Sequence, residues 1–325
     1  FFRSSVDDGF SAATNMDLSV NKFISYLECP KKFFFEYSVN TDEESNALGE
    51  LDAIDSLRRH TFIKETLSIL LSDPKIDIME LVGKIFNSQR VEMGQIPFGV
   101  LGRIAELNFT KYVETQMIPF FYNSILGKFK ISQNVFFNSA ANKTNQSILF
   151  STPTIWDTPI KAHVDFLMQT GDVVYLTFAA SSKDISIKKQ IVASFTCLLL
   201  NQSELILQEL KEFYQLKKVE LRPAILHFPI DQEPELQLGQ SIQLPDEFFK
   251  KFWESLKENQ YPAFPISESK GKDICEYCPV NTVCHGYQTE FQPFLEDEME
   301  QIIKLVTTQF HPTTEKSIPS GKKKK

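Results

Sequence analysis

The hydrophobic residues in the first third of the chain recur mostly at every third or fourth position. Three stretches have this spacing, residues 51–71, 76–86 and 101–122. Residues so spaced lie on one side of an α-helix, so the pattern predicts three amphipathic helices. Pro74 and Pro97 stand between the stretches, and proline ends helices because it removes a backbone donor. We therefore expect this part of the chain to be helical.

From residue 128 the pattern changes to short runs of aromatic and β-branched residues, which predict strands. The expected strands cover residues 148–151, 159–168 and 173–179, with another beginning near residue 128. Residues 169–172, Gln-Thr-Gly-Asp, are the expected hairpin turn between two of them. Further expected elements are helices over residues 185–200, 204–214 and 246–258 and a strand over residues 222–228. Strands alternating with helices predict an α/β fold.

Composition and charge narrow the class of protein. The 325 residues are 42% hydrophobic and carry a net charge of −8, which is typical of a globular chain and argues against coating of nucleic acid by bulk positive charge. The longest apolar runs, such as residues 191–200, are about half of the roughly 20 residues that a membrane span needs. We expect a soluble, cytoplasmic protein with no membrane partner. The chain begins without Met or a signal peptide, so we expect it to start inside a longer polypeptide or after processing.

The five cysteines are the first specific chemical signal. Cys197 lies in an apolar helical run, where a free thiol packs as a small hydrophobic residue. The other four could supply the thiolates of an iron-sulfur cluster or of a structural zinc: Cys29, Cys275, Cys278 and Cys284. One ligand far upstream of three clustered ones favours the iron-sulfur cluster, because zinc modules usually pair two close couples of ligands. His285 keeps a zinc site with three cysteines and one histidine open.

Two segments around these cysteines resemble motifs of a known family. Residues 18–33, LSVNKFISYLECPKKF, resemble the LSxSxLxxYxxCPxxF opening of iron-sulfur nucleases of the PD-(D/E)XK superfamily. Residues 275–284, CEYCPVNTVC, resemble their closing CxxCPxxxxC. Such RecB-like domains occur in AddB-type helicase-nuclease subunits and in CRISPR adaptation nucleases.

The resemblance implies a fold, a domain organisation and a cofactor. The implied fold is α/β and restriction-endonuclease-like, with helices flanking a mixed central sheet and a 4Fe-4S cluster on the four cysteines that clips the N- and C-terminal segments together. One nuclease-fold domain would span residues 17–310, between an N-terminal tail and a basic C-terminal tail over residues 311–325. Within it, residues 45–125 would form a helical insertion and residues 270–288 the cysteine segment.

The resemblance also implies where an active site would lie. Nucleases of this superfamily hold Mg²⁺ or Mn²⁺ with acidic residues and use a lysine to help activate water. Glu106 stands where the family's GxxxH helix has His, Asp165 matches the metal-binding acid, and Gln190 matches a glutamine of the helix after the sheet. Thr177 and Ala179 stand at the acid and the lysine of the (D/E)xK motif. With both replaced, the simplest expectation is an inactive site.

Neighbouring residues could compensate for the two lost groups. Lys161 and His163 precede Asp165 on one expected strand, where alternate residues share a face. Lys183 and Asp184, just after the next strand, are a second candidate pair. A rearranged, active site therefore stays open.

Three functions follow from these observations. The first is a DNA-binding or structural module of a repair or recombination helicase-nuclease assembly, in contact with single-stranded DNA or a DNA end and with a partner subunit. The second is an active Mg²⁺- or Mn²⁺-dependent deoxyribonuclease that uses Glu106, Asp165, His163 and Lys161. The third is a zinc-stabilised interaction protein with no role on nucleic acid.

Overall fold

A computed structural model of the chain describes part of it in detail, and the chain divides into two compact units. The first unit holds residues 1–46, 151–162 and 242–309, and the second holds residues 47–150, 163–241 and 310–325. The described residues are 18–21, 24–25, 62–71, 73, 75–92, 107–132, 143–144, 147–155, 158–182, 184–229, 232–242, 304–306 and 308–312. The predicted helix over residues 246–258 lies outside them.

A four-stranded sheet contains the beginning of the described chain. Its strand order is β1-β5-β4-β3, where β1 is Leu18–Ser19, β3 is Lys143–Thr144, β4 is Ser147–Ile155 and β5 is Thr158–Val164. β1 pairs with β5 in parallel, with Leu18 opposite Ile160. The chain turns helical directly after β1, at residues 20–21.

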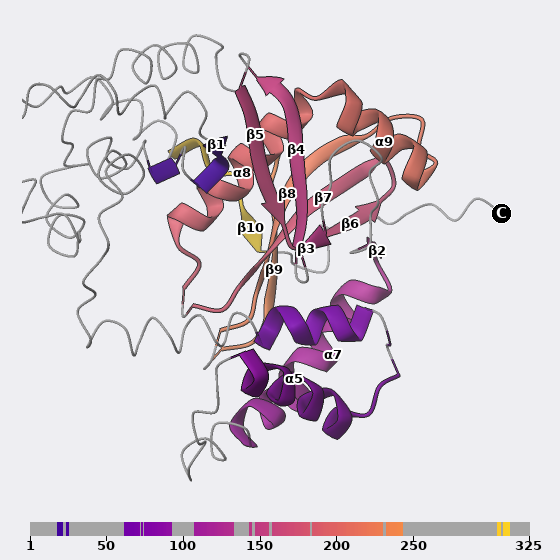
Figure 1. The fold of residues 1–325 in the computed structure, drawn as a ribbon, viewed down its shortest axis with the longest axis vertical. Helices are drawn as coiled ribbons and strands as arrows, with labels where there is room; N and C mark the ends of the chain where they lie inside the picture. Colours follow the sequence, from indigo (N-terminus) through magenta and orange to yellow (C-terminus); the bar gives the residue numbers. More distant parts are fainter. Residues whose placement is uncertain are drawn as a thin grey trace, which may run out of the picture. The chain divides into compact units, whose positions relative to one another are not determined.

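The second unit contains a six-stranded mixed sheet (Figure 1). The strand order is β10-β9-β8-β7-β6-β2, in which β7 and β8 are parallel and the other neighbours are antiparallel. The strands are β2 (Lys130–Ser132), β6 (Phe166–Thr170), β7 (Val173–Ala180), β8 (Glu220–His227), β9 (Glu235–Leu238) and β10 (His311–Pro312). A mixed sheet with flanking helices confirms the predicted α/β class.

The β6–β7 hairpin follows the sequence prediction. Thr170 pairs with Val173, which leaves Gly171 and Asp172 as the two loop residues. Gly171 has φ of 56°, a left-handed conformation that glycine adopts without a Cβ clash. The glycine in the expected turn is therefore what lets the chain reverse in two residues.

Two capped helices connect the parallel strands β7 and β8. α8 (Ile187–Asn201) begins after Ser186, whose side chain accepts a hydrogen bond from the backbone N–H of Lys189. α9 (Glu204–Tyr214) begins after Ser203, which accepts one from Ile206 in the same way. Such caps satisfy backbone donors that a helix start leaves free. Parallel neighbours need a crossover of this kind, because a tight turn cannot join them.

The predicted helical region is present in the described residues. Helix 62–71, α5 (Ile78–Glu92) and a helical run over residues 107–126 make it up. In the third of these, π-helical turns at Val113–Met117 (η1) and Phe121–Leu126 (η2) flank the short α7 (Ile118–Phe120). Pro119 lies in α7 and lacks the N–H that an α-helical ladder would use there.

The π-turns match the hydrophobic spacing of that run. Val113, Met117, Phe121 and Ile125 recur every four residues, and each is at most 1% exposed. A spacing of four exceeds the 3.6 residues of an α-helical turn, so this stripe would wind around a straight α-helix. The wider π-turns hold the four side chains on the side that faces the core.

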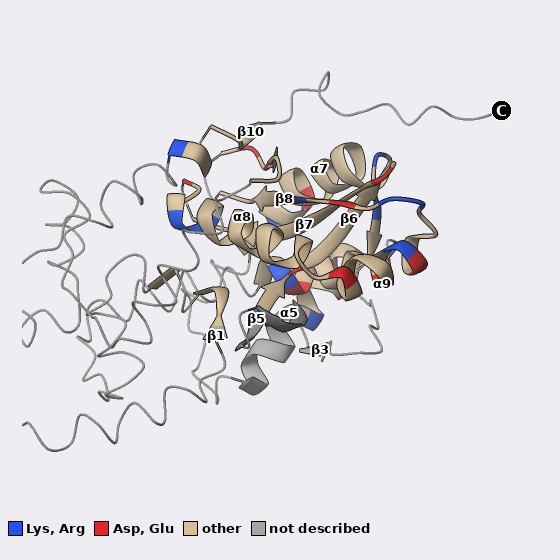
Figure 2. Ribbon diagram, turned by 90° about the horizontal axis from the view of Figure 1, so that it is seen from above, with Lys and Arg blue, Asp and Glu red and all other residues tan. Residues whose placement is uncertain are grey.

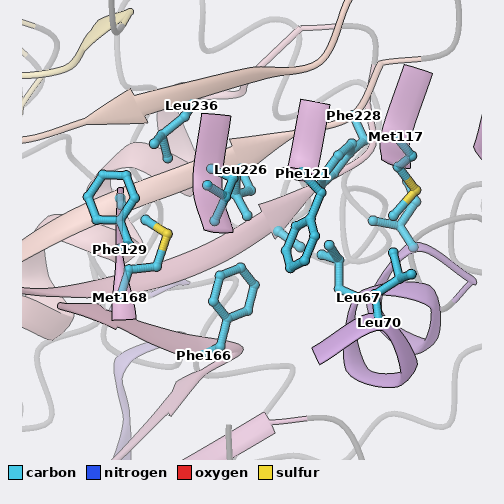
Figure 3. Close-up of a cluster of buried hydrophobic side chains, with 14 of the residues drawn as sticks. Leu67, Leu70, Met117, Phe121, Phe129, Phe166, Met168, Leu226, Phe228 and Leu236 are labelled. Carbon is cyan, nitrogen blue, oxygen red and sulfur yellow. The ribbon is translucent and has the colours of Figure 1, made fainter. Parts of the chain in front are cut away.

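One hydrophobic cluster joins these helices to a face of the six-stranded sheet. Figure 3 shows Leu67 and Phe121 from the helices and Phe166 and Leu226 from the strands converging on it. α8 packs on β7 and β8, and its buried residues are not members of this cluster. The sheet therefore has one face covered by the helical region and the other by α8. Cys197 of α8 is fully buried, which confirms its predicted place in the core.

Candidate functional site

Asp165 lies where the chain passes from β5 to β6, in an arrangement that sequence spacing did not predict. The expected strand over residues 159–168 is interrupted there by a bend. Phe166 is already opposite Thr177 in the β6–β7 register, yet the backbone N–H of Asp165 also donates to the Thr177 carbonyl at 3.0 Å. Two successive residues facing one is the arrangement of a β-bulge, which re-aims a side chain.

The bulge turns the Asp165 side chain inward. Asp165 is 5% exposed, and one carboxylate oxygen, Oδ2, accepts a hydrogen bond from the Ala179 backbone N–H at 2.7 Å. The other, Oδ1, forms an ion pair of 2.5 Å with the Lys64 ammonium of helix 62–71, whose side chain is 19% exposed. Both oxygens of the Asp165 carboxylate therefore have a partner within the protein. Among the described residues, Asp165 is the carboxylate that matches a metal ligand of the resembling family.

Thr177 and Ala179, the positions that align with the acid and the lysine of the (D/E)xK motif, lie in the packed interior. Both are fully buried, and Ala179 is a member of the hydrophobic cluster beneath the helical region. The Thr177 hydroxyl lies 3.4 Å from the Tyr175 carbonyl of its own strand. The side chains of Ala179 and Thr177 are thus uncharged at the two positions where the resembling motif has charged residues.

A second lysine, which the sequence reading missed, interacts with this ion pair. Lys189 is in the first turn of α8 and is partly exposed. Burial lowers the pKa of Lys189; the nearby Asp165 carboxylate opposes that shift, and the nearby Lys64 ammonium adds to it. Asp165 therefore has two cationic neighbours, from helix 62–71 and from α8.

Gln190 follows Lys189 but belongs to a different set of contacts. Its side-chain amide donates to the Gln237 side chain of β9 at 3.5 Å, and Gln237 donates to Glu235 at 2.9 Å. Gln237 is opposite Ile225 in the β8–β9 register, and Ile225 alternates with Ala224 and Leu226 of the hydrophobic cluster. Alternate residues of a strand face opposite sides, so Gln190 is bonded on the α8 side of the sheet, away from the face that carries Thr177 and Ala179.

His227 completes this polar network at the end of β8. It is 3% exposed, and its Nε2 lies 2.7 Å from the Ser182 carbonyl, which only accepts, so Nε2 donates. Its Nδ1 lies 3.3 Å from the Glu235 carboxylate. The contact with Ser182 fixes the loop between β7 and α8. The sequence gives no sign that His227, Glu235 and Gln237 form a group, because only the pairing of β8 with β9 brings them together.

The remaining predicted residues are placed as follows. Lys161 is partly exposed and His163 is exposed on β5, whereas Asp165 is buried beyond the bend. Asp184 is exposed. Glu106, Lys183 and the four cysteines of the expected cluster lie outside the described residues.

The donor set around Asp165 does not fit a divalent cation. Mg²⁺ prefers several carboxylate and water oxygens, but Asp165 uses both of its oxygens within the protein and has two lysines near it. In the described ranges, no group of three or more His, Cys, Asp and Glu side chains is arranged to hold a metal ion. The lysines near Asp165 disfavour a divalent cation through charge repulsion.

Comparisons with known proteins give little further guidance. No family model and no curated protein matches the chain. A solved structure described as "Crystal structure of SSO0001" is similar at a TM-score of 0.31 and 11% sequence identity, over 87% of this chain and 95% of that one. A similarity at this level carries no functional argument.

Among the described residues, no single helix is long and apolar enough to cross a membrane. α8 and α9 reach these values only as a pair, which is bent by 92°.

Proposed function

We propose that this chain is a PD-(D/E)XK nuclease-like module with a 4Fe-4S cluster and an inactive metal site, which binds DNA or has a structural role in a repair or recombination helicase-nuclease assembly. One observation supports the proposal that the metal site is inactive. The Asp165 carboxylate accepts from Lys64 and from the Ala179 N–H, so an ammonium is already paired with it where a catalytic metal would bind.

The order of elements around Asp165 supports the nuclease-like part of the proposal. β6 and β7 form a hairpin, α8 and α9 cross over, and β8 returns parallel to β7. The family resemblance implies a strand ending in an acid, a (D/E)xK strand and then a helix bearing glutamine. Asp165, the Thr177–Ala179 segment and Gln190 occur in that order along these elements.

Loss of hydrolysis has a direct physical reason at positions 177 and 179. A metal-dependent nuclease needs charged ligands around the ion and a group that orients the attacking water. Threonine and alanine supply neither, and general acid-base help alone is worth roughly 10²- to 10⁴-fold in rate. Binding without cleavage is therefore the function that these residues support best.

The iron-sulfur and DNA parts rest on the sequence motifs. The spacing of Cys29, Cys275, Cys278 and Cys284 would give a cubane cluster its four thiolates, one for each iron. About four irons and four acid-labile sulfides per chain, in protein purified without oxygen, is the expected composition. Zinc without sulfide would replace this proposal with that of a zinc-stabilised interaction protein.

A cleavage assay tests the inactive site. The anaerobically purified chain is incubated with end-labelled single-stranded DNA and Mg²⁺ or Mn²⁺, beside the Asp165→Ala variant. We expect DNA binding and the same background of cleavage in both proteins. Cleavage by the wild type that disappears in Asp165→Ala would instead establish an active, rearranged nuclease.

A further inference from the structure

The ring of His227 faces two hydrogen-bond acceptors at the end of β8. Its Nε2 lies 2.7 Å from the Ser182 carbonyl oxygen, and its Nδ1 lies 3.3 Å from the carboxylate oxygen Oε1 of Glu235. A carbonyl and an ionised carboxylate can only accept. A neutral imidazole has one N–H and can donate to one of them, whereas an imidazolium has two and can donate to both. Both contacts are therefore satisfied at once when the ring holds a second proton.

The surroundings of Glu235 place this second proton on Nδ1 of the ring. The same oxygen of Glu235, Oε1, accepts a hydrogen bond from the Gln237 side-chain amide at 2.9 Å. Two donors from neighbouring strands thus converge on one carboxylate oxygen. The His227 side chain is 4% exposed and that of Glu235 is 38% exposed, so the proton reaches water past the glutamate.

Among the described residues, Glu235 is the charged side chain that contacts the ring. The register partner of His227 on the other side is Ala180 of β7, which has no titratable group. The charged residues of α8 are confined to its first turn (Figure 2). The charged residues nearby on the loop after β7, on α8 and before β9 are exposed or partly exposed, namely Asp184, Lys188, Lys189 and Glu233. The bonding of the buried ring therefore depends first on Glu235.

We infer that His227 and Glu235 form a proton-dependent latch on the loop between β7 and α8, residues 181–186. With two protons, the ring bonds Ser182 and Glu235 together and ties the loop to β8 and β9. Loss of one proton to solvent leaves a single N–H for two acceptors. A hydrogen bond to a charged acceptor is the stronger one, so the ring then donates to Glu235 and releases the Ser182 carbonyl. Histidine is the side chain that changes its charge near neutral pH, which makes this latch sensitive to pH.

Release of Ser182 would loosen the loop without opening the elements on either side of it. The last residue of β7 stays paired, because the Phe228 N–H donates to the Ala180 carbonyl at 2.8 Å. Within the loop, the Ser182 hydroxyl donates to the Asp184 carbonyl, and Ser186 caps α8. These last two bonds lie inside the loop and the helix start and do not reach the sheet. The bond from His227 is thus the contact that joins Ser182 to a strand.

Hydrogen exchange of the loop tests the latch, with Glu235→Gln as the deciding variant. The amide introduced at position 235 can donate to Nδ1, so a neutral ring keeps its Nε2–H for Ser182 at any pH. Amide exchange of residues 181–186 is followed by mass spectrometry from about pH 5 to about pH 9, with exchange times adjusted for the intrinsic effect of pH. Wild-type exchange should become about two- to tenfold faster as the pH rises, the factor that one hydrogen bond contributes. Glu235→Gln should abolish this change, and Glu233→Gln, at an exposed acid just before it, should retain it.

A second measurement follows the ring itself. Deuterium uptake at the Cε1 carbon of each histidine, measured by mass spectrometry on the same samples, reports its protonation at each pH. In the wild type, loss of the second proton of His227 should coincide with the faster exchange of the loop. A loop whose exchange stays constant over this range, or changes equally in the wild type and Glu235→Gln, would overturn the inference. The latch does not rest on the proposed function, and neither measurement uses DNA or a metal, so its failure would leave that function intact.

Discussion

The two faces of the six-stranded sheet give polar groups near the end of β7 different surroundings. On the face under the helical region, a hydrophobic cluster surrounds Ala179, and one acid, Asp165, is neutralised by Lys64. On the α8 face, a network of neutral and charged polar side chains runs from Gln190 to His227. The two faces are separated by the thickness of a single strand.

The difference separates a packed, apolar face from a hydrogen-bonded one. Apolar packing dominates the first face around Ala179, where a charge without a partner would be costly. On the second face every polar group named above has a partner, and satisfied networks of this kind fix one geometry. The bond from Gln190 to Gln237 therefore helps to hold the first turn of α8 against the sheet.

A lysine introduced at position 179 disrupts the first face most severely. We expect Ala179→Lys to destabilise the fold by at least about 4 kcal/mol, because the ammonium would enter a fully buried, apolar site. Ala179→Met, which adds similar length without charge, should cost about 1–3 kcal/mol. Urea unfolding followed by circular dichroism measures both. Equal effects would mean that position 179 has access to water and that the site is more open than the packing indicates.

Removing the partner of Asp165 has the next largest effect. Lys64→Met removes the directly paired ammonium from a carboxylate that is 5% exposed, and we expect a loss of about 3 kcal/mol. The control is Lys84→Met, which breaks an exposed ion pair with Glu80 and should cost about 0.5 kcal/mol or less. The double variant Lys64→Met/Asp165→Asn should recover much of the loss. Failure to recover would show that Lys64 acts through its hydrocarbon packing.

The same comparison shows what the sequence could and could not predict. The β6–β7 hairpin and the start of α9 were correct because Gly171 and Ser203 are local signals that act on the next few residues. The break at Asp165 was not predicted, because a bulge is decided by hydrogen bonds to the opposite strand. Lys64 had no sequence signal, since nothing along the chain links helix 62–71 to a residue between β5 and β6.

The polar network on the α8 face shows the same limit. Gln190 was singled out by resemblance to a motif, yet its contacts to Gln237 and Glu235 depend on the pairing of β8 with β9. The hydrophobic spacing predicted a helix over residues 101–122, and the described helical run covers residues 107–126. Its π-turns could be recognised only once the four side chains were seen to share one face.

Substitutions in the hydrogen-bond network test how much the α8 face contributes to stability. His227→Leu leaves the Ser182 carbonyl without its donor, and a lost buried hydrogen bond of this kind costs about 2 kcal/mol. Gln190→Leu, which removes only the 3.5 Å contact with Gln237, should cost less than about 1 kcal/mol. Unfolding free energies again give the comparison. An equal or larger cost for Gln190→Leu would mean that the loop between β7 and α8 is held mainly through Gln237 of β9 and less through His227 of β8.

The pH dependence of stability reports on Lys189, with the smallest expected effect. Its pKa is lowered below 10.5 in the folded chain, mainly by burial, so the unfolded chain binds more protons as the pH approaches 10.5. Stability then rises with pH through this window, because the cost of burying the charged form disappears as Lys189 loses its proton. The difference in unfolding free energy between the wild type and Lys189→Met should therefore move in favour of the wild type between about pH 7 and pH 10. The same difference for Lys218→Met should stay flat. A flat Lys189→Met profile would mean that the ammonium is as well hydrated in the folded chain as in the unfolded one.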